Sequence, residues 1–229
     1  MHENCNNMTQ KELYKHTIEY FQQAMPDAQT ELKYDSTFQL LVAVILSAQC
    51  TDRRVNMVTP RLFQSLPTPA SMASATFDDV LSLISSVSYP NSKARHLIAM
   101  SQMLINDFGG QVPSTLDELT RLPGVGRKTA NVVQSVAFGK AALAVDTHVF
   151  RVSHRIGLVP KSCTTPLATE RHLTRNLPSD LLPQAHHWLI LHGRYVCRAI
   201  NPKCGECGLS AWCRHKEPPR PHKAAGASV

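Results

Sequence analysis

The feature that most constrains the fold is the run FQLLVAVILSAQ, residues 38 to 49, which is apolar around nearly its whole circumference. The run is too long for an ordinary strand and contains no Gly or Pro, so it is predicted to form a helix. A helix that is apolar all round has to be buried on every side. We therefore expect this segment to be a central helix surrounded by other elements.

Helical spacing of apolar residues recurs along the rest of the chain. Thr9 and Glu12 form a capping-box pattern at the start of one predicted helix. Two more helices are predicted within residues 77–87 and 97–108, the second ending at Gly109. Sustained alternation between apolar and polar residues, which antiparallel strands require, is not found. The predicted fold class is all-α.

The charge of the chain makes a polyanion a plausible partner. Lys and Arg number 24 against 17 Asp and Glu, which gives a net charge of +7. Many basic proteins bind no nucleic acid, so charge alone does not decide this. The longest apolar run, residues 40–46, is far shorter than the ~20 residues that a membrane span needs, and residues 1–10 contain no apolar signal core. We expect a cytoplasmic protein without a membrane partner.

The segment LPGVGRKTA, residues 122–130, lies between two helical patterns and contains two glycines. Gly124 and Gly126 permit left-handed backbone conformations and remove side chains, so the amide groups at the start of the second helix can face an anion such as a DNA phosphate. An ordinary helix–helix turn fits the same residues. A nucleotide-binding P-loop fits less well, because Arg127 rather than Gly precedes Lys128 and a helix comes first.

Four of the seven cysteines lie in one short segment near the C-terminus. Cys197, Cys204, Cys207 and Cys213 follow the spacing C-x6-C-x2-C-x5-C. In a chain without a signal peptide, four clustered thiols favour a metal site over disulfides. Because only one close C-x2-C pair is present, the residues by themselves leave zinc and a [4Fe-4S] cluster about equally favoured.

Taken together, these motifs resemble the helix-hairpin-helix DNA glycosylases, and among them the endonuclease III family. The likeness runs from about Leu13 to Cys213. It rests on four segments: LSAQCTD at 46–52, LPGVGRKTANVV at 122–133, AVDTHVFRV at 144–152 and HWLILHGRYVC at 187–197. The resemblance favours the [4Fe-4S] cluster at the four cysteines.

The resemblance implies two catalytic residues. Lys128 is implied to attack the sugar of a damaged nucleotide and form a Schiff base, and it lies beside Arg127 at the positive end of a helix, which favours the neutral amine. Without the resemblance, Lys128 would be taken as a phosphate-binding or solvated lysine. Asp146 is implied to stabilise positive charge on the sugar, and it also has the position of an ordinary N-cap.

The resemblance also implies DNA contacts. Gln49 matches the residue that the family inserts into the gap left by a flipped nucleotide. Tyr89 lies where the family usually has a second, aliphatic inserted residue, and Pro90 follows it. The full set of expected DNA contacts is Gln49, Tyr89, Leu122, Gly124, Val125, Gly126, Arg127, Thr147, His148, Arg198 and Lys203.

The resemblance completes the expected organisation and function. We expect a six-helix domain with the hairpin at 30–140, an iron–sulfur domain from 1–29 plus 141–215, a substrate cleft between them, and a disordered tail at 216–229. The expected activity is excision of oxidised pyrimidines from duplex DNA, with β-elimination at abasic sites, by a monomer at the bacterial nucleoid. A catalytically silent DNA-binding protein with a cysteine-bound zinc is the alternative. Adenine-excising relatives fit less well, because the helix at 38–49 contains no acid and Lys128 is present.

Overall fold

The computed structural model describes residues 8–215, and the predicted disordered tail, 216–229, lies outside this range. The described residues form eleven α-helices, two short 3-10 turns and no β-strand, which confirms the all-α class. The α-helices are α1 Gln10–Ala24, α2 Thr37–Ser47, α3 Asp52–Ser65, α4 Pro69–Ser74, α5 Phe77–Ile84, α6 Pro90–Phe108, α7 Leu116–Arg121, α8 Arg127–Phe138, α9 Thr147–Ile156, α10 Pro166–Asn176 and α11 Leu182–Tyr195. The 3-10 turns are Ser179–Leu181 and Cys204–Glu206.

The chain divides into two compact units. Unit 2 consists of Gln29–Ala144 and Ser179–Pro183. Unit 1 takes the described residues up to Ala28, the segment Val145–Pro178 and the described residues from Gln184 onward. Within the described residues, no helix is long and apolar enough to cross a membrane.

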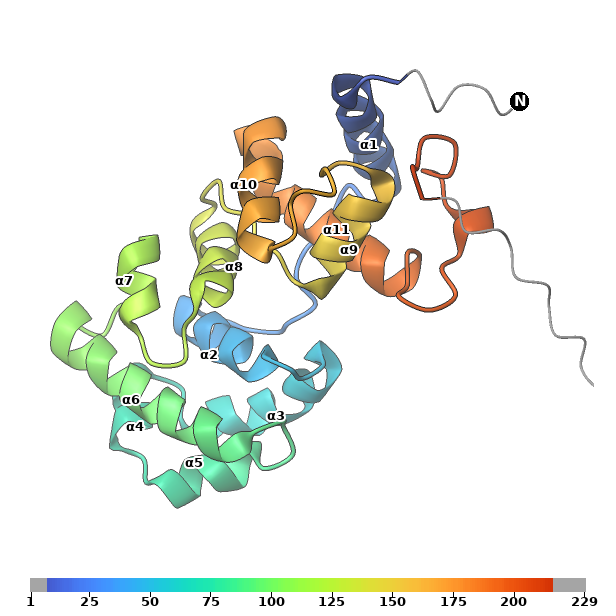
Figure 1. Ribbon diagram of the computed structural model, residues 1–229. Helices are drawn as coiled ribbons and strands as arrows, with labels where there is room; N and C mark the ends of the chain where they lie inside the picture. The colour runs from blue at the N-terminus through green and yellow to red at the C-terminus, as the bar shows by residue number, and fades with distance from the viewer. Residues whose placement is uncertain (1–7, 216–229) are drawn as a thin grey trace, which may run out of the picture. The chain divides into compact units, whose positions relative to one another are not determined.

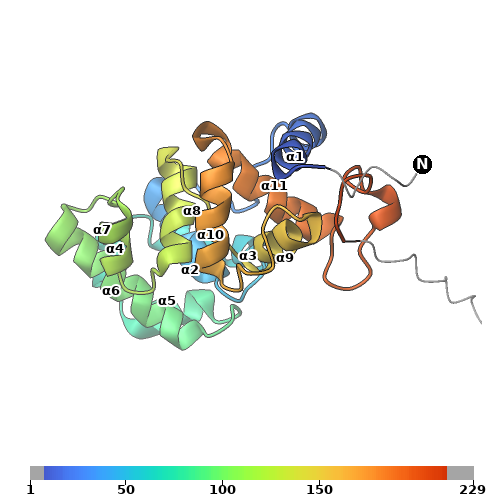
Figure 2. The same ribbon diagram turned by 45° about the horizontal axis from the view of Figure 1, so that its top comes forward.

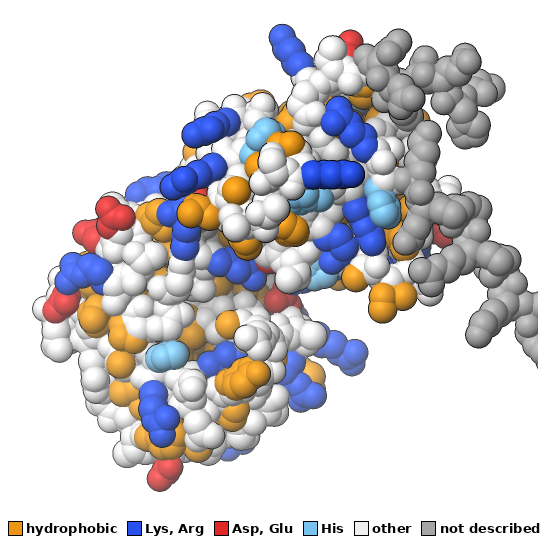
Figure 3. All heavy atoms as spheres, in the orientation of Figure 1, with side chains coloured by type: hydrophobic (Ala, Val, Ile, Leu, Met, Phe, Trp, Pro, Cys, Tyr) orange, Lys and Arg blue, Asp and Glu red, His pale blue; other side chains and the backbone are white. Residues whose placement is uncertain are grey.

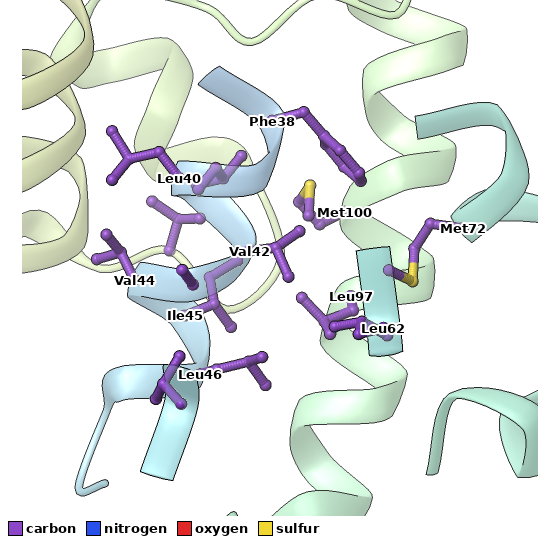
Figure 4. Close-up of a cluster of buried hydrophobic side chains, with 14 of the residues drawn as sticks. Phe38, Leu40, Val42, Val44, Ile45, Leu46, Leu62, Met72, Leu97 and Met100 are labelled. Carbon is purple, nitrogen blue, oxygen red and sulfur yellow. The ribbon is translucent and has the colours of Figure 1, made fainter. Parts of the chain in front are cut away.

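Helix α2 is the centre of unit 2. It packs against α3, α6 and α8, while α4 and α5 pack against α6 (Figure 1). Its side chains from Phe38 to Leu46 are all buried, as a helix that is apolar all round requires. Figure 4 shows Leu40 and Val44 pointing to one side of α2, while Phe38 points toward Met100 of α6. The expectation of a buried central helix is confirmed.

The end of α2 differs from the expected boundary. The helix ends at Ser47, with Ala48 as its C-cap, whereas the apolar pattern suggested a helix that continues to Gln49. Gln49 has a left-handed backbone with φ of 54°, so it belongs to the short link before α3. Periodicity does not reveal this break, because Ala and Gln are both good helix formers.

Unit 1 is held together by contacts between segments that are far apart in the sequence. Phe21 of α1 stacks on Trp188 of α11, with ring centroids 5.7 Å apart, and the Trp188 indole donates to the Met25 carbonyl at 2.8 Å. The Tyr14 hydroxyl donates to the Leu158 carbonyl, which follows α9, at 2.9 Å. Helices α1, α9 and α11 lie side by side in both ribbon views (Figures 1 and 2).

Candidate active site and cysteine cluster

The turn between α7 and α8 depends on one glycine. Gly124 has a φ of +79°, and a Cβ added there would lie 2.9 Å from the Cβ of His96 in α6. Both the left-handed backbone and the close approach exclude a larger residue. The Val125 amide donates to the Leu122 carbonyl at 3.0 Å and closes the turn, while the side chains of both residues are buried. Leu122 and Val125 can therefore face a ligand mainly with their backbones.

Gly126 is the residue at which α8 begins. It is the N-cap of α8 and has an extended backbone with φ of −88°, so it does not use the left-handed conformation that glycine permits there. A Cβ at Gly126 would meet no atom within 4 Å, and no side chain caps the helix. The first amide groups of α8 therefore stand beside open space, which is the arrangement that binds an anion at a helix N-terminus.

Lys128 lies in the first turn of α8 and its side chain is exposed, as is that of Arg127. The two residues follow directly after the uncapped helix start at Gly126. Positive side chains and an uncapped helix start thus occur together within three consecutive residues, 126–128. This arrangement places an amine where a nucleic-acid backbone would be bound.

Sequence reasoning missed the residues that brace the hairpin. The side chains of Gln134 and Lys140 both donate to the Ser114 carbonyl just before α7, at 2.9 and 2.6 Å. The amide of Asn131, which is buried in α8, donates to the Leu143 carbonyl at 3.3 Å. These bonds hold α8 against the segments on either side of the hairpin. Their signal is weak in sequence, because single polar residues on a helix are usually solvated.

Asp146 is the N-cap of α9, as one of its two expected roles requires. Its Oδ1 accepts the Val149 amide at 2.8 Å. Its other carboxylate oxygen accepts no hydrogen bond from the residues that the structure describes. One oxygen therefore caps the helix, and the Asp146 side chain is half-buried.

The residues after Asp146 join α9 to the end of α11. His148 Nδ1 lies 3.2 Å from the Arg151 guanidinium, which also donates to the Gly193 carbonyl at 2.9 Å and the Cys197 carbonyl at 3.1 Å. A Cβ on Gly193 would lie 2.8 Å from the His148 Cβ, so only glycine allows this approach. Thr147 is exposed at the helix start. Arg151 is another residue that sequence reasoning missed.

The two residues expected to enter DNA share an unusual backbone. Gln49 and Tyr89 both have φ of 54°, and among the described residues only Asn201 joins them as a non-glycine with positive φ. Both side chains are exposed, Tyr89 to 65%. Tyr89 is followed by Pro90 at the first position of α6 and has no side-chain cap bond.

The cysteine segment is held in place by α9. The Arg155 guanidinium donates to the carbonyls of Arg198 and Ala199, at 2.7 and 3.2 Å, and to the sulfur of Cys197 at 3.7 Å. The Cys213 thiol donates to the Arg155 carbonyl at 3.2 Å. A single arginine thus links the first and last cysteines of the motif. Sequence reasoning did not identify Arg155.

The four clustered thiols are half-buried and influence one another electrostatically. Burial, followed by the charges of the other three cysteines, raises the pKa of Cys213 to about 11. Bound metal relieves such repulsion, because it stabilises the thiolates. No three His, Cys, Asp or Glu side chains within residues 8–215 are placed to hold one metal ion. In a [4Fe-4S] cluster each cysteine binds a different iron, so the sulfurs spread wider than around one zinc.

The exposed loop between the first two cysteines contains the expected basic residues. Arg198 and Lys203 are both exposed. Lys203 forms a 3.6 Å ion pair with Glu206, and the Arg198 guanidinium donates to the Asn201 carbonyl at 3.1 Å. On the face displayed in Figure 3, Lys and Arg side chains outnumber Asp and Glu. His186 and His192, by contrast, are buried.

Comparison with known proteins bears directly on these features. A family model for HhH-GPD superfamily base excision DNA repair proteins matches residues 42–179, which include the second half of α2, the hairpin and Asp146. A second model, for the iron-sulfur binding domain of endonuclease III, matches residues 197–213, from the first to the last clustered cysteine. The chain belongs to the endonuclease III family. The predicted resemblance is confirmed.

Relatives within the endonuclease III family match most of the chain. Endonuclease III of Bacillus subtilis (strain 168) is 47% identical over 189 residues, covering 82% of this chain and 86% of that protein. The Escherichia coli (strain K12) protein is 43% identical over 192 residues, covering 84% and 90%. A solved structure of a trapped endonuclease III–DNA covalent intermediate has a TM-score of 0.86 at 43% identity and covers 90% of this chain and 97% of that chain. A thermostable thymine-DNA glycosylase, 22% identical with a TM-score of 0.80, shares the fold.

Membership of the endonuclease III family determines the general activity. The chain is a DNA-binding enzyme of base excision repair, a DNA glycosylase with abasic-site lyase activity. Its cofactor is a [4Fe-4S] cluster. The silent, zinc-containing DNA-binding protein is excluded by this assignment.

Proposed function

We propose that the enzyme excises oxidised pyrimidines from duplex DNA and then cleaves the strand at the abasic site through a Schiff base on Lys128. The observation that carries this proposal is the exposed lysine in the first turn of α8, directly after an uncapped, glycine-lined helix start. A relative of this chain has been trapped as a covalent intermediate with DNA, which supports a nucleophilic side chain.

The reaction begins when the damaged nucleotide leaves the base stack, which costs less for a weakly stacked lesion. The neutral Nζ of Lys128 attacks C1′ of the deoxyribose, and the glycosidic bond breaks with its electron pair going to the departing base. Loss of a proton and ring opening leave an imine between Nζ and C1′. Removal of a C2′ proton then breaks the C3′–O3′ bond, which is β-elimination.

Asp146 stabilises the positive charge that develops on the sugar in this scheme. Its Oδ1 is held by the Val149 amide, so the second oxygen has a defined direction before substrate arrives. Lys128 belongs to unit 2 and Asp146 to unit 1. The proposed division of the chain is a six-helix domain, 30–140, which contains Lys128, and an iron–sulfur domain, 1–29 plus 141–215, which contains Asp146.

The DNA contacts follow from the same positions. Gly124, Gly126 and Arg127 face a phosphate at the hairpin, and Leu122 and Val125 shape the turn beside it, since their amides donate to the carbonyls of Leu119 and Leu122. Thr147 and His148 contact DNA at the start of α9. Gln49 and Tyr89 enter the duplex where the nucleotide is extruded. Arg198 and Lys203 attract phosphates, Lys203 less strongly because Glu206 is its ion-pair partner.

The remaining parts of the proposal concern the cofactor and the setting. Cys197, Cys204, Cys207 and Cys213 supply the four thiolates of the [4Fe-4S] cluster, whose role is to hold the loop that contains Arg198 and Lys203. The enzyme acts as a monomer on damaged chromosomal DNA at the bacterial nucleoid.

The test is borohydride trapping on duplexes that each contain one lesion. The wild type should become covalently linked to abasic-site DNA and to oxidised-pyrimidine DNA. Lys128→Ala should lose linkage and cleavage but retain abasic-site binding, because one surface charge contributes little to total phosphate attraction. Lys33→Ala is the matched control, since Lys33 is an exposed lysine of the same unit. Normal trapping by Lys128→Ala would show that another amine is the nucleophile.

A further inference from the structure

Gln49 and Tyr89 both have a backbone that needs support from neighbouring contacts. A left-handed conformation is unfavourable for residues other than glycine, so it persists only where the surroundings hold it. Both side chains are exposed and so do not anchor themselves by packing. The support has to come from backbone contacts made by other residues.

Lys93 supplies such contacts to both segments. It lies near the start of α6, and only 5% of its surface is exposed to solvent. Its ammonium donates to the carbonyls of Leu46 and Ala48, at 2.8 and 2.7 Å. Its own amide donates to the Tyr89 carbonyl at 3.2 Å. One residue therefore joins the end of α2, next to Gln49, to the turn that contains Tyr89.

These contacts suit the chemistry of a helix end. The last carbonyls of a helix have no partner inside it, and the negative end of the helix dipole attracts a cation. Burial lowers the pKa of Lys93, the Cys50 thiol acting in the opposite direction. A buried amine is costly unless its hydrogen bonds are satisfied, and here two carbonyls satisfy them. The presence of a lysine in the buried face of α6 is thus explained by its partners.

We infer that Lys93 is a positioning residue for DNA insertion, holding Gln49 and Tyr89 in one fixed arrangement before DNA is bound. The inference rests on the proposed function, in which these two side chains enter the duplex. A group that has to fill a gap in the base stack works best when it is already ordered, because ordering it during binding lowers affinity. Lys93 does not touch DNA in this account, since it is buried.

The experiment uses 2-aminopurine placed opposite a tetrahydrofuran abasic analogue in duplex DNA. Entry of a side chain into the gap changes the stacking of 2-aminopurine and therefore its fluorescence. Wild-type protein should give a fluorescence change that Gln49→Ala loses. Lys93→Met, which keeps the length of the side chain but donates no hydrogen bond, should lose most of the change, and Lys93→Arg should retain it.

Activity on two substrates separates positioning from general stability. Lys93→Met should slow single-turnover excision of a damaged base by roughly tenfold to a hundredfold. It should slow cleavage of a preformed abasic site much less, because no base has to be extruded there. Leu104→Ala, which creates a cavity at the other end of α6, should lower the melting temperature without changing the ratio of the two rates.

A double-mutant cycle completes the test. If Lys93 acts through Gln49, then Lys93→Met should have little further effect in the Gln49→Ala background. A full additional loss there, or equal slowing on both substrates, would show that Lys93 is merely structural. If Lys93→Met fails to fold, Lys93→Gln replaces it in the same assays, because glutamine keeps a hydrogen-bond donor but is too short to reach both carbonyls. If the wild type gives the fluorescence change and Lys93→Met gives it too, or Lys93→Gln does where Lys93→Met does not fold, this inference alone is overturned. If the wild type gives no fluorescence change, the insertion role of Gln49 and Tyr89 is overturned as well.

Discussion

Asp146→Asn and Asp146→Ala should differ in stability but not in activity. The carboxylate of Asp146 accepts the Val149 amide at 2.8 Å and so caps α9. Asparagine caps a helix about as well as aspartate, whereas alanine loses the bond at a cost of about 1 kcal/mol. For a chain of this size, 1 kcal/mol corresponds to a shift in melting temperature of roughly 2–4 °C. Asp146→Asn should therefore melt close to the wild type and Asp146→Ala a few degrees lower.

The expected loss of activity is much larger than that change in stability. Removing a preorganised charge from a transition state typically slows the reaction by roughly 10²–10³-fold. A loss of about 1 kcal/mol leaves a typical protein folded, since unfolding costs about 5–15 kcal/mol. Unfolding therefore cannot account for such slowing. Both Asp146 variants should lose single-turnover base excision to a similar extent.

The control is a cap of the same kind in the same unit. Thr165 Oγ1 accepts the Ala168 amide at 3.1 Å at the start of α10. Thr165→Ala should lower the melting temperature about as much as Asp146→Ala and leave the excision rate unchanged. The assay combines thermal melting with single-turnover excision on duplex DNA. Normal excision by Asp146→Asn would refute the reasoning and leave Asp146 with only its capping role.

Three further predictions follow from the geometry. Gly124→Ala should destabilise unit 2 by at least ~1 kcal/mol in thermal melting, because Gly124 has a positive φ and an added Cβ would lie against His96. Gly126→Ala should fold normally but bind DNA more weakly in a titration, because its Cβ would occupy the open space at the start of α8. Cys207→Ser should purify with far less iron than the about four atoms per chain expected of the wild type. It should also bind DNA more weakly, with an affinity that depends less on salt. One zinc and no iron in wild-type protein made with ample iron would contradict the cluster assignment. Burial, followed by the charge of Arg194, lowers the pKa of His187 to about 4, below the usual 6.5. Neutral His187 therefore stabilises the fold above about pH 6.5 and this stability is lost as pH falls toward 4, so His187→Gln should flatten the melting temperature between pH 6.5 and 5.

Local patterns in the sequence predicted most of the elements. The capping box of Thr9 and Glu12 forms at the start of α1, and α6 ends at Phe108 with Gly109 as its left-handed cap. Both features depend on interactions within a few residues, so the sequence contains all the information that they require. Sequence reasoning missed the end of α2, because the break before Gln49 is stabilised by Lys93, which lies in another helix, α6.

The cysteine spacing and the glycine hairpin identified the family, since motifs of this kind are short and contiguous in the sequence. They did not decide between the two glycines of the hairpin. Gly124 needs its left-handed backbone because of His96, whereas Gly126 is extended and faces open space. The difference depends on α6, which the turn contacts only after folding.

The sequence by itself determined the helical class, the central buried helix and the candidate residues Lys128, Asp146 and the four cysteines. Only the tertiary structure revealed the residues that hold them in place. Lys93 reaches carbonyls 45 and 47 residues away, and Arg155 reaches the Arg198 carbonyl 43 residues away. Such contacts leave no periodic or spaced pattern in the sequence, because the bonding partner is a backbone carbonyl and every residue has one.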